Sequence, residues 1–186
     1  MKSILVIIVG LNILVHQGWS QDRYFTKTGS ISFYSHAPIE DIRAINQQVA
    51  SMLDIKTGDI LFAVLIRSFV FRKAMMQEHF NENYMESEIY PRSTFEGRII
   101  NINEIDLSVP GNYTVNITGD LTIKDQSNPI ETTGTLSVQS DKRIKGDSKF
   151  TIQVKDYGIA IPRILRRKIA ENIEITCELM YEPYDQ

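Results

Sequence analysis

Hydrophobic and polar residues alternate along most of this chain, which is the pattern of a β-strand with one buried face and one face in water. The clearest alternation runs from Tyr113 to Lys124, where apolar residues and Gly119 occupy every second position. Similar runs predict further strands over residues 31–35, 45–55, 60–69, 95–102, 133–140, 149–155 and 173–181. The connections are too short for parallel crossovers, so the sequence predicts about eight antiparallel strands.

Turn-forming residues separate these runs. Pro38 ends the first strand, because proline removes a backbone donor. Residues 56–59 give a hairpin turn signal, and residues 127–129 predict another turn. Residues 21–29 are polar and read as a lead-in to the first strand. The run 40–55 fits both a helix face and a strand, and the hairpin turn after it favours a strand, which the turn needs as its antiparallel partner.

One stretch, residues 73–80, changes to helical spacing. It contains good helix formers and neither Gly nor Pro, and its apolar residues fall on one side of a helix. Asn81, Asn83 and Pro91 then predict the end of the helix and the return to extended chain. A short helix so rich in Met and Phe, placed between strands, is expected to plug the interior of the sheet.

The length of the strands decides between a sandwich and a barrel. Runs of up to about 12 residues exceed the average of about 5–6 residues that is typical of globular proteins. Closing the sheet would also remove its unpaired edges. The sequence therefore predicts an all-β fold, an eight-stranded antiparallel lipocalin-like barrel with one short Met/Phe-rich helix.

The N-terminus predicts export. Lys2 precedes an apolar run over residues 4–15, and Gly18 and Ser20 are the small residues of a cleavage site. Residues 1–20 are thus predicted to be a signal peptide, and residues 21–186 a single domain that is periplasmic or secreted. A membrane anchor is the alternative, but the run is shorter than the roughly 20 residues that a spanning helix needs.

Charge limits the partners. The formal net charge of the 186 residues is −3, and removal of Lys2, with no acid lost, makes it −4. This balance predicts no nucleic-acid partner and no obvious polybasic patch for anionic lipid. No stable membrane anchor is expected, and a homodimer stays open. The only basic block covers residues 163–168 and is interpreted as a solvated face.

Candidate catalytic and metal-binding residues are few. Beyond the signal peptide the only histidines are His36 and His79, far apart and without paired cysteines, so no metal site is predicted. Cys177 is the only cysteine and alternates with polar neighbours, which is typical of a small core residue and excludes an internal disulfide. No nucleophile–base pair or phosphate loop is present. We expect no catalysis and no cofactor.

Several motifs together resemble the YceI-like family of lipocalin-like barrels associated with polyisoprenoid binding, and in particular its secreted Bacteroidetes-type members. The motifs are Phe69-x-Phe71, Met75-Met76, His79-Phe80, Tyr84, Tyr90-Pro91-x-x-x-Phe95-x-Gly97, Gly119-Asp120-Leu121-Thr122-Ile123, Phe150-x-Ile152 and Asp156-Tyr157-Gly158-Ile159. The resemblance covers nearly everything after residue 25. After the Leu-Thr-Ile run the family leads us to expect His-Gly, where this chain has Lys124-Asp125.

The resemblance implies a lipid cavity in the barrel, and the many aromatic and methionine residues suit one. The candidate ligand-binding residues are Phe33, Phe62, Phe69, Phe71, Met75, Met76, His79, Phe80, Tyr84, Tyr90, Phe95, Tyr113, Phe150 and Tyr157. Of these, His79, Tyr84 and Tyr90 are expected at the mouth. The expected function is binding of an amphiphilic lipid, either a polyisoprenoid or a quinone-like chain. The alternatives are an envelope interaction barrel with a packed interior and, ranked last, a hydrolase or isomerase.

Overall fold

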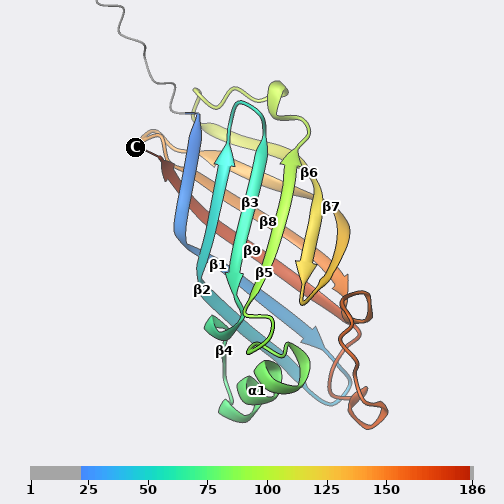
Figure 1. Ribbon diagram of the computed structural model, residues 1–186. Helices are drawn as coiled ribbons and strands as arrows, with labels where there is room; N and C mark the ends of the chain where they lie inside the picture. The colour runs from blue at the N-terminus through green and yellow to red at the C-terminus, as the bar shows by residue number, and fades with distance from the viewer. Residues whose placement is uncertain (1–21, 185–186) are drawn as a thin grey trace, which may run out of the picture.

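The computed structural model describes residues 22–184. The predicted signal peptide, residues 1–20, lies outside the described residues. Eight long strands form the body of the molecule (Figure 1), and they are β1 Arg23–His36, β2 Asp41–Asp54, β3 Asp59–Leu65, β5 Arg92–Ile99, β6 Gly111–Ile123, β7 Gln126–Val138, β8 Ile144–Gln153 and β9 Asn172–Pro183. The two-residue strand β4, Val70–Phe71, is added to the beginning of β2.

The strands form one antiparallel sheet that closes on itself. Their order is β1-β9-β8-β7-β6-β5-β3-β2, and β1 pairs with β2 to complete the ring. This confirms the predicted eight-stranded antiparallel barrel. Closure gives each long strand two neighbours over at least part of its length, which removes most of the free edge that an open sheet would expose.

Helical segments lie in the connections. The helix α1, Ala74–His79, continues as a π-helical turn η2, Phe80–Tyr84, at one end of the barrel (Figure 1). The other helical segments of residues 22–184 are four 3₁₀ turns, η1 Ile66–Ser68, η3 Ile102–Glu104, η4 Val154–Tyr157 and η5 Arg163–Leu165. The turn η5 lies at the same end as α1, whereas η3 lies at the opposite end. We call these the helix end and the terminal end, because both described chain ends lie at the same end of the barrel as η3.

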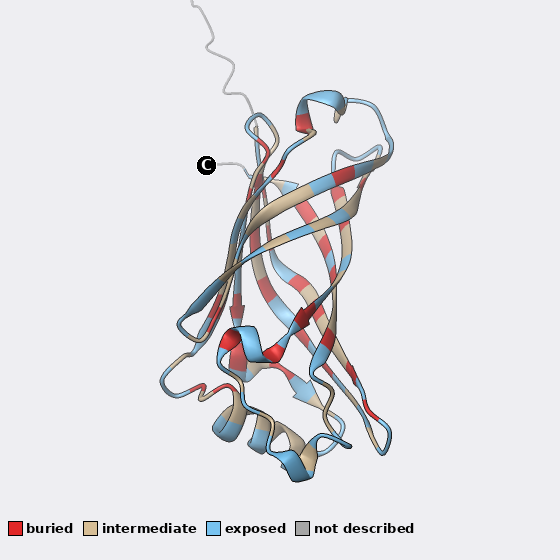
Figure 2. Ribbon diagram, turned by 90° about the vertical axis from the view of Figure 1, so that its right-hand side faces the viewer, coloured by how far each residue is buried: buried red, intermediate tan, exposed pale blue. Residues whose placement is uncertain are grey.

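Side chains that point alternately into and out of the barrel place the core inside it. Along β6 and β8, buried and half-buried residues alternate with exposed ones for much of each strand (Figure 2). The terminal half of the barrel is filled, since Val49, Leu53, Ile144 and Tyr181 are fully buried there. The Tyr181 hydroxyl is hydrogen-bonded to Ser51 Oγ at 2.7 Å, which satisfies both polar groups inside this core.

Sequence predictions of strand boundaries were wrong at the start of β1 and at the turn after β6. Residues 23–29 are part of β1 and not a polar lead-in, because Tyr24 and Thr26 turn inward and are buried while Arg23 and Lys27 are exposed. The chain reverses at Lys124-Asp125, in a two-residue hairpin loop, and not at residues 127–129, which belong to β7. Lys124 takes a positive φ of 57° there, the geometry for which glycine is usually used.

Pro129 is tolerated in β7 because that strand is paired on one side only at this point. β7 pairs with β6 along its whole length, but its pairing with β8 begins only at Gly134. The missing donor of a proline costs least where the ladder is incomplete. β7 and β8 are therefore not paired along the part of their length that lies toward the helix end.

The connection after β3 also differs from its prediction. The strand predicted over residues 60–69 ends at Leu65, and the 3₁₀ turn η1 follows, with the Ile66 N–H donating to the Pro91 carbonyl. The predicted helix exists but extends past Asn81 to Tyr84, because the chain widens into a π-helical turn. The Asn81 side chain donates to the Gln77 carbonyl within this turn.

Candidate functional site

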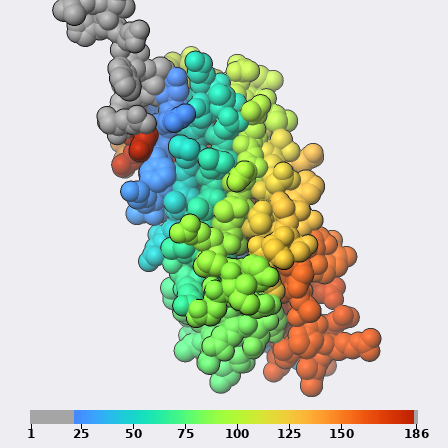
Figure 3. All heavy atoms as spheres, in the orientation of Figure 1, coloured from blue at the N-terminus to red at the C-terminus, as the bar shows by residue number. Residues whose placement is uncertain are grey.

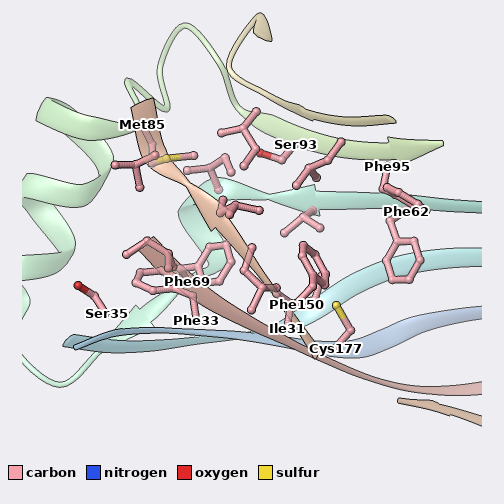
Figure 4. A pocket seen from close by; sticks show the side chains of 18 of the residues that line it. Ile31, Phe33, Ser35, Phe62, Phe69, Met85, Ser93, Phe95, Phe150 and Cys177 are labelled. Carbon is pink, nitrogen blue, oxygen red and sulfur yellow. The ribbon is translucent and has the colours of Figure 1, made fainter. Parts of the chain in front are cut away.

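A cavity of about 510 Å³ occupies the barrel between the filled terminal half and the helix end. Its size lies within the range of about 300–1,000 Å³ that is usual for small-molecule sites. Mostly apolar side chains from the eight long strands form the larger part of its wall, and α1, η2 and residues 159–169 contribute most of the rest at the helix end. Figure 4 shows part of this lining. Eleven of the fourteen sequence-predicted residues line it, and they are Phe33, Phe62, Phe69, Phe71, Met75, Met76, His79, Phe80, Tyr84, Phe95 and Phe150.

Four aromatic rings close the cavity beneath α1. Phe33, Phe69, Phe71 and Phe80 form what we call the phenylalanine cluster, with ring centroids 5.0–5.7 Å apart. The rings come from β1, β4, η2 and the residue between η1 and β4, so they join the helical cap to the barrel wall. Aromatic pairs at such distances are stabilising beyond their buried area.

A second aromatic pair lies deeper, on the β3–β5 side. Phe62 and Phe95 meet edge to face at 6.0 Å, away from Met85 and the helical cap (Figure 4). Gly97 and Gly119 face each other across β5 and β6, and a Cβ on either would approach the Phe95 ring within 2.7 Å or less. The two glycines therefore let the Phe95 ring lie against the backbone and leave the interior open.

Three predicted residues do not line the cavity. Tyr113 lies toward the terminal end, where its hydroxyl donates to the Val109 carbonyl at 2.8 Å. Tyr157 is buried in η4, and burial together with Asp156 raises its pKa to about 12. Tyr90 lies outside the wall, with the Lys124 ammonium 5.6 Å from the centre of its ring. Aromatic type alone did not distinguish these residues from the lining ones.

Polar atoms are scarce inside the cavity. Ser35 Oγ accepts a hydrogen bond from the Ala170 N–H at 2.9 Å. Ser93 is only 7% exposed, lines the cavity, and has no hydrogen-bond partner for its hydroxyl among the described residues. A buried unpaired hydroxyl is unfavourable, so Ser93 offers an unused hydrogen bond to a polar group placed near it.

Among the described residues, no hydrogen bond joins a lining serine or cysteine to a basic side chain. Burial raises the pKa of the Cys177 thiol to about 12, which keeps it protonated and weakly nucleophilic at neutral pH. Within residues 22–184, no three His, Cys, Asp or Glu side chains group closely enough to hold a metal ion. The arrangement can bury an apolar molecule and hydrogen-bond to it.

Charged side chains surround the mouth. The cavity reaches the surface between α1 and the chain around η5, where the lining residues Met75, His79 and Lys168 are exposed. Two further lining residues, Lys73 and Glu40, form an ion pair of 2.6 Å across this opening. An apolar interior with a charged rim is the arrangement that suits an amphiphilic ligand.

The β6–β7 hairpin loop is joined to the segment after η2. Lys124 Nζ donates to Glu86 Oε1 at 2.5 Å, and the Lys124 side chain is 11% exposed. Glu86 also has a positive φ, of 49°. Lys124, which stands where the family led us to expect His, therefore ties the helical cap to the barrel wall.

Sequence reasoning missed the polar lining residues. Ser93 looked like an ordinary strand residue, and nothing in its neighbourhood marked it as unpaired. Glu40 and Lys73 lie 33 positions apart, so only the closed barrel brings them together. Lys168 lay in a basic block that was interpreted as solvent-facing, and its place beside the mouth follows from how residues 159–171 cross the helix end.

Fold and cavity together define a closed eight-stranded barrel with an apolar interior, the architecture that holds one small ligand in lipocalin-like proteins. The chain belongs to the YceI-like domain family, whose domain matches residues 24–181. No curated protein matches the chain.

Solved structures agree on the fold. A polyisoprenoid-binding domain from Saccharophagus degradans, implicated in plant cell wall breakdown, has a TM-score of 0.74 at 16% identity, covering 88% of this chain and 99% of that one. BcnA from Burkholderia cenocepacia has a TM-score of 0.69 at 15% identity, with 83% and 96% covered. The Campylobacter jejuni YceI protein has a TM-score of 0.54 at 14% identity, and both chains are fully covered.

Proposed function

We propose that this protein is exported and binds one amphiphilic lipid, a polyisoprenoid or a quinone-like chain, in the barrel cavity without catalysis. The observation that carries the proposal is the apolar cavity of about 510 Å³ with its charged mouth. The structurally similar Saccharophagus degradans domain is described as polyisoprenoid binding, which supports the same ligand class here.

The ligand would lie with its apolar chain against the phenylalanine cluster and the Phe62–Phe95 pair. Burial of apolar surface contributes about 25 cal/mol per Å² and needs no directional contact, so it accepts chains of varied structure. Ser93 and the rim formed by Glu40 and Lys73 are the places where a polar group on the ligand could be recognised.

The alternative of a packed interior does not fit a cavity of this size. A hydrolase or isomerase would need an acid–base pair or an activated nucleophile facing the substrate. The lining carboxylates Glu40 and Asp147 are already paired with Lys73 and Lys145, and burial keeps Cys177 protonated. Binding is thus the function that the geometry supports best.

A cavity-filling substitution tests the proposal. Ile175 is half-buried on β9 and lines the cavity, so Ile175→Trp should occupy ligand space. We expect affinity for a polyprenol to fall about tenfold or more, about 1.4 kcal/mol. Thr176→Trp is the matched control, since the next residue on a strand points to the other face. Equal affinity of the Ile175→Trp variant and the unchanged protein would contradict cavity binding.

A further inference from the structure

The most exposed large apolar side chain among the described residues belongs to Ile164, in the 3₁₀ turn η5, at 87%. It lies within a dense basic segment, with Arg163 before it and Arg166, Arg167 and Lys168 shortly after. We call residues 162–169 the basic lobe. It projects at the helix end beside, and separate from, the lobe formed by α1 (Figure 3).

The basic lobe has a defined conformation. The Leu165 N–H donates to the Pro162 carbonyl, and the Lys168 and Ile169 N–H groups both donate to the Leu165 carbonyl, at 2.8–2.9 Å. The Ile39 N–H donates to the Arg167 carbonyl at 2.9 Å and fastens the lobe to the β1–β2 turn. Ile39 is itself 55% exposed, so a second apolar side chain lies beside the basic residues.

Most of the positive charge of the lobe is not neutralised. Arg166 faces Glu171 at 3.7 Å, whereas no acidic partner is found for Arg163, Arg167 or Lys168 among the described residues. Exposed apolar side chains surrounded by unpaired cations are the composition of surfaces that lie in the interface of a lipid bilayer.

The lobe also borders the mouth of the cavity. Leu165, Lys168 and Ile169 line the cavity, while Ile164, Arg163 and Arg167 do not. A bilayer that touched the exposed side of the lobe would therefore lie next to the opening. An apolar ligand could then move between bilayer and cavity with little exposure to water.

From these observations we propose that the basic lobe docks on a membrane containing anionic lipids, with Ile164 inserted between head groups and Arg163 and Arg167 on their phosphates. The partner is a bilayer surface, touched reversibly, and none of the helices in residues 22–184 is long and apolar enough to cross it. The role of docking in ligand transfer rests on the proposed lipid-binding function. The contact between the basic lobe and the bilayer is tested separately.

Acidic residues set the orientation. Glu78 in α1 and Glu82 in η2 are exposed and have no ion-pair partner among the described residues. An anionic surface repels these carboxylates, so the protein should tilt with the basic lobe against the bilayer and α1 away from it. The contacts with phosphate should weaken as salt rises, because the Debye length is about 10 Å at 0.1 M salt and falls from there.

Tryptophan fluorescence offers a direct test. The chain has a single Trp, Trp19, which lies in the predicted signal peptide, so the chain that begins at Gln21 has none. Ile164→Trp then reports on the lobe alone. Val109, 51% exposed in the loop between β5 and β6 at the terminal end, gives the matched control Val109→Trp. Both variants are first stripped of lipid and then mixed with phosphatidylglycerol–phosphatidylcholine vesicles.

We expect the emission of the Ile164→Trp variant to shift to the blue with these vesicles, and that of the Val109→Trp variant to stay unchanged. Adding Arg163→Gln and Arg167→Gln to the Ile164→Trp variant should weaken vesicle binding roughly tenfold to thirtyfold. Each basic residue contributes about 1 kcal/mol of attraction to an anionic surface. The charge control is Lys56→Gln with Lys142→Asn, whose sites lie in turns at the terminal end.

Three results would overturn docking. They are no shift for the Ile164→Trp variant, an equal shift for the Val109→Trp variant, or equal binding to vesicles of phosphatidylcholine alone. Polyprenol affinity of the same variants, measured without vesicles, separates the two proposals. If the Ile164→Trp protein with both arginines intact fails to bind vesicles but binds polyprenol normally, docking alone is refuted, whereas absence of polyprenol binding in every variant refutes the proposed function.

Discussion

At the residue scale, the polar atoms inside the cavity differ in how they are satisfied. Ser35 accepts a backbone hydrogen bond, whereas the Ser93 hydroxyl has no partner among the described residues, although both serines are buried. Burying an unpaired hydroxyl costs about 1–3 kcal/mol. A ligand that forms a hydrogen bond with the Ser93 hydroxyl would remove this cost.

Ser93→Ala should therefore leave the free energy of unfolding of the lipid-free protein unchanged or raise it by about 1 kcal/mol. Affinity for an amphiphile with a hydroxyl or carbonyl group should fall about tenfold, while affinity for a pure hydrocarbon chain stays the same. Calorimetry with the two ligands measures this. Ser35→Ala is the control, and it should destabilise the protein, because the Ala170 N–H loses its acceptor. Equal losses for both ligands would contradict a polar contact at Ser93.

Cys177 should behave as a core residue. Burial raises its pKa from 9.0 to about 12, so the thiol stays protonated in the folded protein at pH 8. We expect labelling by a maleimide to follow unfolding, with native protein reacting at least about a hundredfold more slowly than protein in denaturant. The unfolded thiol ionises first as the pH rises, so its contribution to stability is complete below about 9 and is lost between 9 and 12. Fast labelling of native protein would show an accessible thiolate.

At the element scale, α1 and η2 cover the cavity with one side packed inward and the other side exposed to solvent. Phe80 packs into the phenylalanine cluster, Met76 is half-buried, and Met75 is 67% exposed although it also borders the cavity. The cap therefore depends on the inward residues of a short helix that has no side-chain cap at its N-terminus.

Met76→Glu should lower the melting temperature by several degrees, since a carboxylate placed against apolar rings loses hydration and costs about 1–3 kcal/mol. Met75→Glu, its neighbour on the exposed side, should cost less than about 0.5 kcal/mol. Thermal unfolding followed by circular dichroism compares the two. If both variants melted at the same temperature, the helix would not be packed on the interior.

The ion pair between Lys124 and Glu86 should hold the cap in place. Because the Lys124 side chain is largely buried, Lys124→Gln should cost about 1 kcal/mol, more than an exposed pair contributes. Hydrogen exchange in residues 86–90 should become faster. Arg143→Gln removes the exposed pair with Asp141 at the terminal end and should change stability by less than about 0.5 kcal/mol. No change in exchange after Lys124→Gln would show that the pair does not restrain the cap.

Strands and helices could be predicted from the sequence wherever the local spacing of apolar residues determines them. The alternation from Tyr113 to Lys124 gave β6, and the change of spacing at Lys73 gave α1. Several boundaries were wrong, and two of them have a clear tertiary reason. β1 begins at Arg23 because it has partners on both sides, and Pro129 is accepted in β7 because one side of that strand is still unpaired. A short stretch of sequence does not show which strands pair with β1 or where the pairing of β7 with β8 begins.

The candidate site divides in the same way. Phe69, Phe71 and Phe80 could be identified because each is aromatic and fits the local pattern, which is strand alternation for Phe69 and Phe71 and helical spacing for Phe80. Ser93 and the Glu40–Lys73 pair could not, because their role depends on which strands meet and on which partners are missing. The same holds for the basic lobe, whose position beside the mouth depends on the path of residues 159–171 across the helix end.

At the scale of the whole molecule, the barrel is filled in one half and hollow in the other. Tyr181, Leu53 and their neighbours pack the terminal half, while Gly97 and Gly119 let the Phe95 ring lie against the wall near the cavity. The filled half supplies stability without any disulfide among the described residues. The hollow half can then keep an apolar volume that costs some stability when empty, by about 24 cal/mol per Å³ in core-truncation experiments.

The most direct test of this account is native mass spectrometry of the protein purified gently from its own host, followed by lipid extraction. We predict one long-chain amphiphile bound per chain, and its absence from the Ile175→Trp variant prepared in the same way. An empty protein that also fails to take up added polyprenol and gains no thermal stability from it would contradict the claim that the cavity is a lipid site.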